Sequence, residues 1–169
     1  VESGINVIDT ARNYRHGRSE HVVGEAIRAA EIEREAILLC SKAGFVAFES
    51  ERPADPAGYV RDRYIDTGLA ASNEIVKGNC ITPAFVSAQL DRSLSVLGVG
   101  TIDMHYINNP ETQLERFDHE TVYDRLEDTF TMLEKRAAAG DIRHYGVASW
   151  ECFRVPKSAP DYLSLPEIV

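Results

Sequence analysis

The sequence predicts an α/β fold with a parallel sheet, because strand-like and helix-like segments alternate along the chain. Apolar runs typical of buried strands lie near residues 5–8, 36–42, 101–107 and 142–147. Stretches with helical spacing of apolar residues separate most of these runs. Strands joined by helical crossovers form parallel sheets with right-handed connections. Both a doubly wound sheet and a (β/α)8 barrel satisfy this order.

The first βα unit begins with a strand that contains Ile5, Val7 and Ile8 and ends at Asp9. After a polar loop, Ser19 is expected to cap a helix. Its inward face is predicted to hold Val22, Val23, Ala26, Ile27 and Ala30. The second strand, residues 36–42, is apolar at consecutive positions and ends in Lys42, as expected for a strand covered on both faces.

Residues 44–79 interrupt the alternation with glycines, prolines and mixed charges. An excursion of this length inside a compact domain is typical of a lid, a binding loop or a mobile segment. Because it follows a strand, we expect it to emerge beside the strand ends where α/β proteins hold their sites. A lid and a disordered insertion are both open at this point.

The second half of the chain has two clearly bounded helices. Thr82 and Pro83 start the first, and its apolar stripe of Val86, Leu90, Leu94 and Leu97 closes at Gly98. Asp118 is expected to cap the second, which runs to Gly140 with an apolar stripe at residues 122, 126, 130, 133 and 137. Strands are predicted at residues 101–107 and 142–147.

Both ends of the chain suggest a part of a larger domain. No Met starts the sequence, and the first strand begins almost at once. At the other end, Ser164 and Pro166 begin a helix that has almost no residues left. We therefore predict a single partial domain over residues 1–169, truncated at both ends.

Composition narrows the classes of function. The 169 residues are 44% hydrophobic and 27% charged, as in ordinary globular proteins. A net charge of −9 and a pI near 5.0 argue against nucleic acid or an anionic membrane as a partner. Three scattered cysteines fit reduced thiols in a cytoplasmic protein, and their spacing indicates no metal site. No strand is followed by G-x-G-x-x-G or a Walker-type loop.

Polar side chains with complementary chemistry follow the predicted strands. Asp9 ends the first, with Tyr14 in the loop after it; Lys42 ends the second and Asn108 the third, and Ser149 and Trp150 follow the fourth. Taken singly, these would be a cap, a surface tyrosine, a solvated lysine, a turn and a packing tryptophan. Taken together, a carboxylate and an ammonium would hold each other ionised if both were buried. An ammonium near a phenol eases proton exchange near neutral pH.

The motifs around these residues resemble those of the aldo-keto reductases. The first is Gly4-x-Asn6-x-Ile8-Asp9-Thr10-Ala11-x-x-Tyr14, followed by Gly17-x-Ser19-Glu20 and Gly24. The others are Ser41-Lys42-x-Gly44, Ser93-Leu94-x-x-Leu97-Gly98 with Ile102-Asp103, and Gly140-x-Ile142-Arg143-x-x-Gly146-Val147. They cover nearly the whole chain, in family order and with compatible spacing.

The resemblance implies a (β/α)8 barrel that binds NADP(H) and reduces an aldehyde or ketone, a small-molecule carbonyl substrate. By position, Tyr14 is the general acid, Lys42 assists it, and Asp9 holds Lys42 and faces the nicotinamide ribose. Only about four parallel strands with crossover helices are present, so we expect a partial barrel. The family's groups for the cofactor phosphates and adenine lie in the missing half, and the fragment alone is expected to be inactive.

Two site positions depart from the family pattern. Asn108 stands where the family has a catalytic histidine; Asn keeps an NH2 donor for a carbonyl but cannot ionise near pH 7. His105 lies three residues earlier and is expected to point to the opposite face. The family's Ser-Asn pair for the carboxamide falls on Ala148-Ser149, which leaves Ser149 as a partial replacement. Trp150 is a candidate wall of the substrate pocket.

The altered histidine position leaves two functions open. The first is NADPH-dependent carbonyl reduction, impaired in this fragment. The second is a non-catalytic scaffold of the same fold that binds nucleotide or protein partners.

Overall fold

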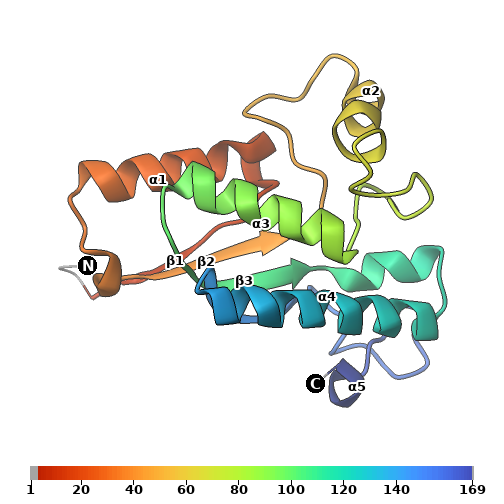
Figure 1. Ribbon diagram of the computed structural model, residues 1–169. Coiled ribbons are helices and arrows are strands. Elements are labelled where there is room, and N and C mark those ends of the chain that lie inside the picture. Colours follow the sequence, from red (N-terminus) through yellow and green to blue (C-terminus); the bar gives the residue numbers. More distant parts are fainter. Residues whose placement is uncertain (1–3, 169) are drawn as a thin grey trace.

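A four-stranded parallel sheet is the centre of the molecule (Figure 1). The computed structural model describes residues 4–168. The strands are β1 (Val7–Asp9), β2 (Leu38–Ala43), β3 (Ile102–Asn108) and β4 (Ile142–Ala148), and they pair in the order β1-β2-β3-β4. All three pairings are parallel, with Asp9 opposite Cys40, Lys42 opposite Tyr106, and Asn108 opposite Ala148. The predicted α/β class, with parallel strands that alternate with helices along the chain, is confirmed.

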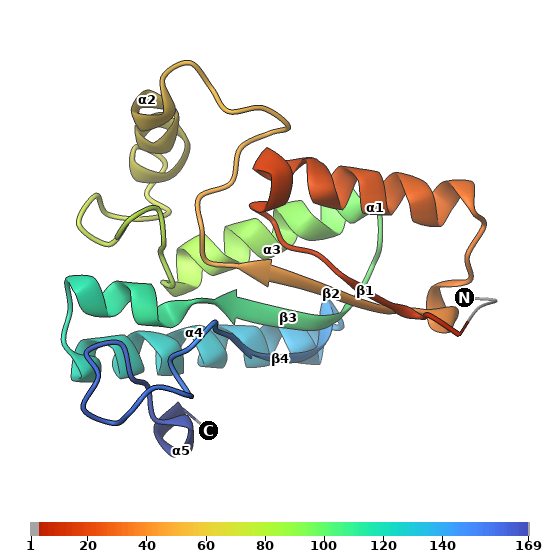
Figure 2. The same ribbon diagram turned by 180° about the vertical axis from the view of Figure 1, so that it is seen from behind.

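Three long helices cover one face of this sheet: α1 (Arg18–Ala29), α3 (Pro83–Leu97) and α4 (His119–Ala139). Seen from behind, the strands lie in front of these helices, so the other face of the sheet carries no long helix among residues 4–168 (Figure 2). Shorter elements complete the chain: η1 (Tyr14–Gly17), η2 (Arg34–Ala36), α2 (Pro56–Val60), η3 (Arg61–Ile65), η4 (Pro110–Glu115) and α5 (Leu165–Ile168).

The ends of α3 and α4 lie where the sequence predicts, although Thr82 at the N-cap of α3 makes no side-chain capping hydrogen bond. Pro83 occupies the first turn of α3, and Gly98 ends it in the left-handed conformation with φ 70°. Asp118 caps α4 by accepting a hydrogen bond of 2.9 Å from the Thr121 amide, and Gly140 ends that helix with φ 88°. Both caps fix where the helices return to the sheet. The main core lies between sheet and helices and includes Leu39, Leu90, Ile107, Leu126 and Ile142.

The first helix differs from its prediction. It begins at Arg18 after a left-handed Gly17, so Ser19 lies inside the helix, where its Oγ accepts a hydrogen bond from Thr10. Val22, Ala26 and Ala30 are exposed, and the buried face is Glu20, Gly24 and Ile27. The reason is close contact with α3: a Cβ on Gly24 would lie 2.7 Å from the Leu97 carbonyl oxygen.

Residues 44–79 form a folded segment beyond the carboxyl end of β2 (Figure 1). Asp55 caps α2 through the Gly58 amide, and the π-helical turn η3 follows directly. A second small core of Tyr64, Ala70, Cys80 and Phe85 packs the segment against the start of α3. The structure therefore gives this stretch regular elements that its composition did not indicate.

Two further observations concern the cysteines and the helices. The three cysteines, Cys40, Cys80 and Cys152, are unpaired and buried. Within residues 4–168, every helix is too short or too polar to cross a lipid bilayer.

His105 makes stability depend on pH. It is fully buried between sheet and helices, and among the described residues neither ring nitrogen has a hydrogen-bond partner. Burial, and then the charge of Arg136, lower its pKa to about 3. Because the unfolded chain binds this proton near pH 6.5, stability is complete above that pH and falls progressively as the pH drops toward 3.

Because of His105, we expect the unfolding free energy to decrease by about 2 kcal/mol when the pH is lowered from 7 to 5. Urea unfolding at both pH values measures it. His105→Leu should remove most of this difference, while His144→Leu, at an exposed histidine of β4, should keep it. An equal pH difference in His105→Leu and the parent would contradict the assignment.

Candidate functional site

The carboxyl ends of the four strands bring the predicted site residues to one edge of the sheet. Lys42, the residue before the end of β2, donates hydrogen bonds from Nζ to Asp9 Oδ1 at 2.9 Å and Oδ2 at 2.7 Å. It also donates to the Thr10 carbonyl oxygen at 2.9 Å. All three Nζ protons therefore have acceptors, and the ammonium is held at the end of β1.

The burial of this pair is unequal, which corrects one expectation. The Lys42 side chain is 9% exposed, but the Asp9 side chain is 53% exposed. The reason is that β1 is a short strand at the edge of the sheet. Asp9 thus keeps surface that is free to accept hydrogen bonds from a bound molecule.

Tyr14 lies next to this ion pair. The Lys42 ammonium is 4.9 Å from the centre of the Tyr14 ring, and the tyrosine is 38% exposed. Backbone bonds fix the loop that carries it, because the amides of Thr10 and Arg12 donate to the carbonyls of Cys40 and Lys42 at 3.0 Å each. The loop continues the pairing of β1 and β2 past the strand end and thereby places the phenol beside the ammonium.

A cavity of about 370 Å³ lies at this edge. Its lining residues are Asn13, Tyr14, Lys42, Phe45, Asn108, Asn109, Ala148, Ser149 and Trp150. Five of the six predicted site residues therefore line one cavity, and Asp9 reaches it through Lys42. Trp150 is 77% exposed, so it forms an outer wall and is not a core packing residue.

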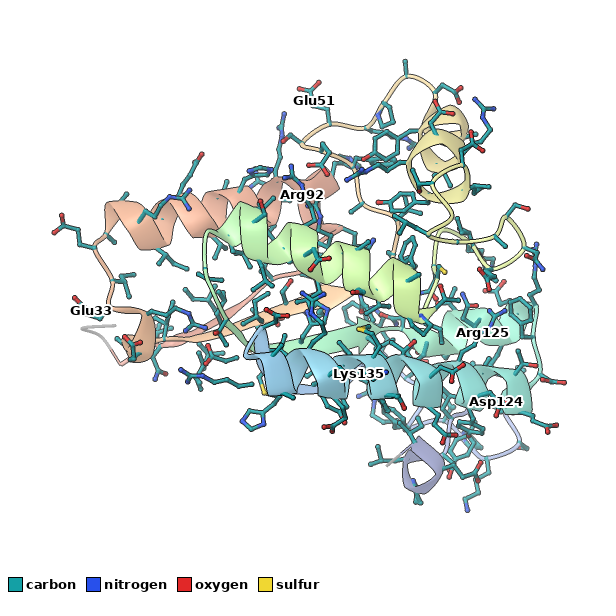
Figure 3. The ribbon with its side chains drawn as sticks, in the orientation of Figure 1. Glu33, Glu51, Arg92, Asp124, Arg125 and Lys135 are labelled. Atoms are coloured by element: carbon teal, nitrogen blue, oxygen red, sulfur yellow. The ribbon has the colours of Figure 1, made fainter. Side chains whose placement is uncertain are left out.

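The backbone at Asn108 is held in place by a network of polar side chains. The backbone carbonyl oxygen of Asn108 accepts a 2.9 Å hydrogen bond from Asn79 Nδ2. Gln113 Nε2 donates to Asn79 Oδ1 at 3.0 Å, and Arg125 Nη1 donates to Gln113 Oε1 at 2.8 Å. Arg125 comes from α4, on the helical side of the sheet (Figure 3). His105 lies buried on the opposite side of β3 near Arg136, as predicted, and does not reach the cavity.

Ser149 is engaged by a residue that sequence analysis missed. Its Oγ donates to Glu111 Oε1 at 2.8 Å and accepts from the Cys152 amide at 3.0 Å. Asn109 Nδ2 donates to the same Glu111 oxygen at 3.0 Å. Glu111 thus joins the loops after β3 and β4. Its only sequence signal is an acidic residue directly after Asn-Asn-Pro.

Arg12 is the second residue that was missed, and it is 2% exposed. Its Nη2 donates to Glu49 Oε1 at 2.8 Å, and its Nη1 lies 3.6 Å from Glu20 Oε2. Glu20 accepts in turn from Ser41 Oγ at 2.6 Å. This chain of contacts ties the Tyr14 loop to α1, to β2 and to the 44–79 segment.

Glu49 receives a second arginine from α3. Arg92 Nε donates to both Glu49 oxygens, at 3.2 and 3.1 Å. Figure 3 shows Arg92 between α3 and the 44–79 segment, whereas Glu51 of that segment points outward. Burial alone would raise the pKa of Glu49, but Arg92 and Arg12 outweigh burial and lower it. Glu49 therefore stays ionised at neutral pH, and its ion pairs link the segment to Arg12 and to Arg92 of α3.

The chain is similar in sequence to proteins that are already known. The sequence model of the Aldo/keto reductase family matches residues 1–162. An uncharacterized oxidoreductase of Bacillus subtilis (strain 168), YqkF, is 29% identical over 149 residues, which are 88% of this chain and 37% of that protein. The NADH-specific methylglyoxal reductase of Escherichia coli (strain K12) is 28% identical, over 86% of this chain and 37% of its own length. The chain thus spans little more than a third of these relatives.

Solved structures agree. The aldo-keto reductase AKR11C1 from Bacillus halodurans, in its holo form, superposes with a TM-score of 0.57 at 25% identity, over 88% of this chain and 38% of that one. A second structure, from Pseudomonas aeruginosa, has a TM-score of 0.53 at 22% identity and supports the fold alone. Because these relatives are (β/α)8 barrels, the four-stranded sheet is part of a barrel and not of a doubly wound sheet. The chain belongs to the aldo/keto reductase family.

Proposed function

We propose that these residues carry the proton-donating half of a reductase site, and that the whole protein reduces an aldehyde or ketone with NADPH. The observation that carries this proposal is Lys42, whose Nζ holds both oxygens of Asp9 and lies over the Tyr14 ring at a cavity wall. Aldo-keto reductases use a nicotinamide cofactor, and family membership supports oxidoreductase chemistry.

Each residue has a distinct role in this proposal. The Tyr14 hydroxyl donates a proton to the substrate carbonyl oxygen and is left as a phenolate. The Lys42 ammonium stabilises that negative charge because it is positively charged and 4.9 Å from the ring centre. Asp9 fixes Lys42 through two hydrogen bonds. Asn108 offers its side-chain NH2 to orient the carbonyl but cannot relay a proton.

The residues present fit the nicotinamide end of the cofactor. Asp9 is half exposed and can accept hydrogen bonds from ribose hydroxyls. Tyr14 and Trp150 offer ring faces at the same cavity, and Asn109 and Ser149 offer polar groups for a carboxamide. Ser149 must turn its hydroxyl proton away from Glu111 to donate there. The bound cofactor supplies the hydride.

We place this activity in the cytoplasm, which three buried, unpaired cysteines support. We also propose that the 169 residues alone bind NADPH weakly. In the described residues β1 and β4 are each paired on one side only, and four strands cannot close a barrel.

The test follows cofactor absorbance with a panel of aldehydes and ketones, using protein expressed from the complete gene and the 169-residue chain in parallel. We expect turnover with NADPH by the complete protein alone. Faster turnover with NADH would change the cofactor but keep the reaction, as the name of the Escherichia coli relative suggests. Cofactor binding without turnover of any carbonyl would favour the non-catalytic scaffold. Saturable micromolar NADPH binding by the 169 residues would contradict the impairment.

We propose that the 44–79 segment acts as a lid over this site. Phe45 of the segment already lines the cavity. If NADPH binding closes the segment, trypsin cleavage at the exposed Arg61 and Arg63 should slow, while cleavage at the exposed Lys157 stays unchanged as an internal control. Cleavage after Arg61 and Arg63 at the same rate with and without NADPH would contradict the proposal that the segment is a lid.

A further inference from the structure

A second cavity, of about 540 Å³, lies between the Tyr14 loop and the 44–79 segment. Six of its lining residues are apolar: Phe45, Val46, Phe48, Ala57, Val60 and Ile75. All six come from the 44–79 segment, either from its loops or from α2, which stands beyond the carboxyl end of β2 (Figures 1 and 2). The segment thus contributes the whole of this apolar wall at the edge where the strands end.

This second cavity adjoins the first. Asn13 and Phe45 line both of them. A molecule whose carbonyl lies at Tyr14 would therefore extend past Asn13 and Phe45 along the apolar wall. The two cavities together offer a reactive end and a binding end, which is the usual division in sites for small molecules.

The loops that carry the apolar wall are braced by hydrogen bonds and ion pairs in the ligand-free structure. The Val46 amide donates to the Gly78 carbonyl at 2.7 Å, and the Ser50 amide to the His16 carbonyl at 2.9 Å. The Tyr64 hydroxyl donates to the Ala47 carbonyl at 2.9 Å, and Glu49 is held by Arg12 and Arg92. These bonds brace the loops that carry the lining side chains, which reduces the ordering needed when a ligand binds.

The charges around the wall do not favour an anionic ligand. Lys77 is its one ammonium, and this group lies 2.6 Å from Glu115 Oε2. The His16 ring packs beside Phe48 at 6.0 Å between ring centres, and Phe48 packs beside Tyr59 at 5.3 Å. Glu115 thus offsets the charge of Lys77, and the aromatic rings present apolar surface.

From the adjacency of the two cavities and the charges around the wall, we infer that the substrate is an aldehyde or ketone with an uncharged apolar body. This body packs on the wall formed by Phe45, Phe48, Val60 and their neighbours. The inference rests on the proposed function, because the reacting carbonyl is placed at Tyr14. Apolar packing holds substrate and transition state alike, so it sets KM more than kcat.

The experiment compares three probes in the protein expressed from the complete gene: 2-naphthaldehyde, which has an apolar body; 4-formylbenzoate, which is anionic; and glyceraldehyde, which is small and polar. Ala57→Trp fills the wall cavity from the first turn of α2. Ala54→Trp places the same side chain at an exposed position of the same segment, outside both cavities, and is the matched control. Val60→Asp, which puts a charge on the wall, is the second variant should Ala57→Trp not fold.

In the parent and in Ala54→Trp we expect 2-naphthaldehyde to have the lowest KM. Ala57→Trp should raise its KM about tenfold or more at unchanged kcat, and leave glyceraldehyde unaffected. An unchanged KM for 2-naphthaldehyde in Ala57→Trp and Val60→Asp overturns the inference while the proposed function stands. So does a lower KM for 4-formylbenzoate in the parent.

A failure of the proposed function gives a different result. If no aldehyde is reduced, 2-naphthaldehyde binding is measured without cofactor by ligand-observed NMR. Binding that Ala57→Trp weakens about tenfold and Ala54→Trp retains supports the apolar site on its own. Equal binding by both variants overturns it.

Discussion

Replacing Tyr14 with phenylalanine is expected to lower kcat for aldehyde reduction about 10²–10⁴-fold, because the substitution removes only the hydroxyl that would donate the proton. The ring stays beside Lys42, which lies 4.9 Å from its centre. Cofactor affinity should therefore change little. Steady-state kinetics and a fluorescence titration with NADPH, both on the protein from the complete gene, measure the two quantities separately.

Tyr145→Phe is the matched control for this variant. Tyr145 lies on β4, where its ring packs beside Phe130 of α4 and its hydroxyl bonds to Glu134, away from the catalytic cavity. Its loss should leave turnover unchanged. Full turnover in Tyr14→Phe would rule out Tyr14 as the proton donor, whatever the result for the control.

Restoring a histidine at residue 108 should have the second large effect, a rise in kcat of about 10-fold or more. Asn108 is 8% exposed and lines the cavity with Tyr14 and Lys42. An imidazole at this position would therefore lie beside the substrate carbonyl that Tyr14 protonates. It would add a group that ionises near neutral pH, which asparagine lacks. The pH profile of kcat should then gain a step between pH 6 and 7.

The control places the same substitution at Asn73, an exposed residue of the 44–79 segment. Asn73→His should change neither kcat nor its pH profile. If Asn108→His lowers turnover at every pH, Asn108 is adapted to its own role and is not a weakened form of the family histidine.

Local patterns in the sequence were sufficient to predict most of the sheet. The strands have their own apolar runs, and α3 and α4 have their own periodicity and end signals, such as Pro83 with Gly98 and Asp118 with Gly140. The strand ends then placed Tyr14, Lys42 and Asn108 at one edge, and the cavity contains all three.

The parts that could not be predicted depend on contacts between distant residues. Arg12 is buried because Glu20 and Glu49 approach it from two other segments. The 44–79 segment is likewise held by Glu49 and Arg92, whose pairing no local pattern shows. Val22 and Ala26 fit a helical stripe, yet they are exposed because α1 meets α3 through Gly24.

The most direct test of the central claim is transfer of a deuterium label by the protein expressed from the complete gene. NADPH deuterated at nicotinamide C4, on either face in separate runs, is incubated with a reactive aldehyde, and the alcohol is examined by mass spectrometry. We predict that one of the two labelled cofactors delivers deuterium to the carbinol carbon of the product, at a rate that Tyr14→Phe lowers sharply. Alcohol without label from either cofactor, or no alcohol at all with NADPH or NADH, would contradict reduction at this site.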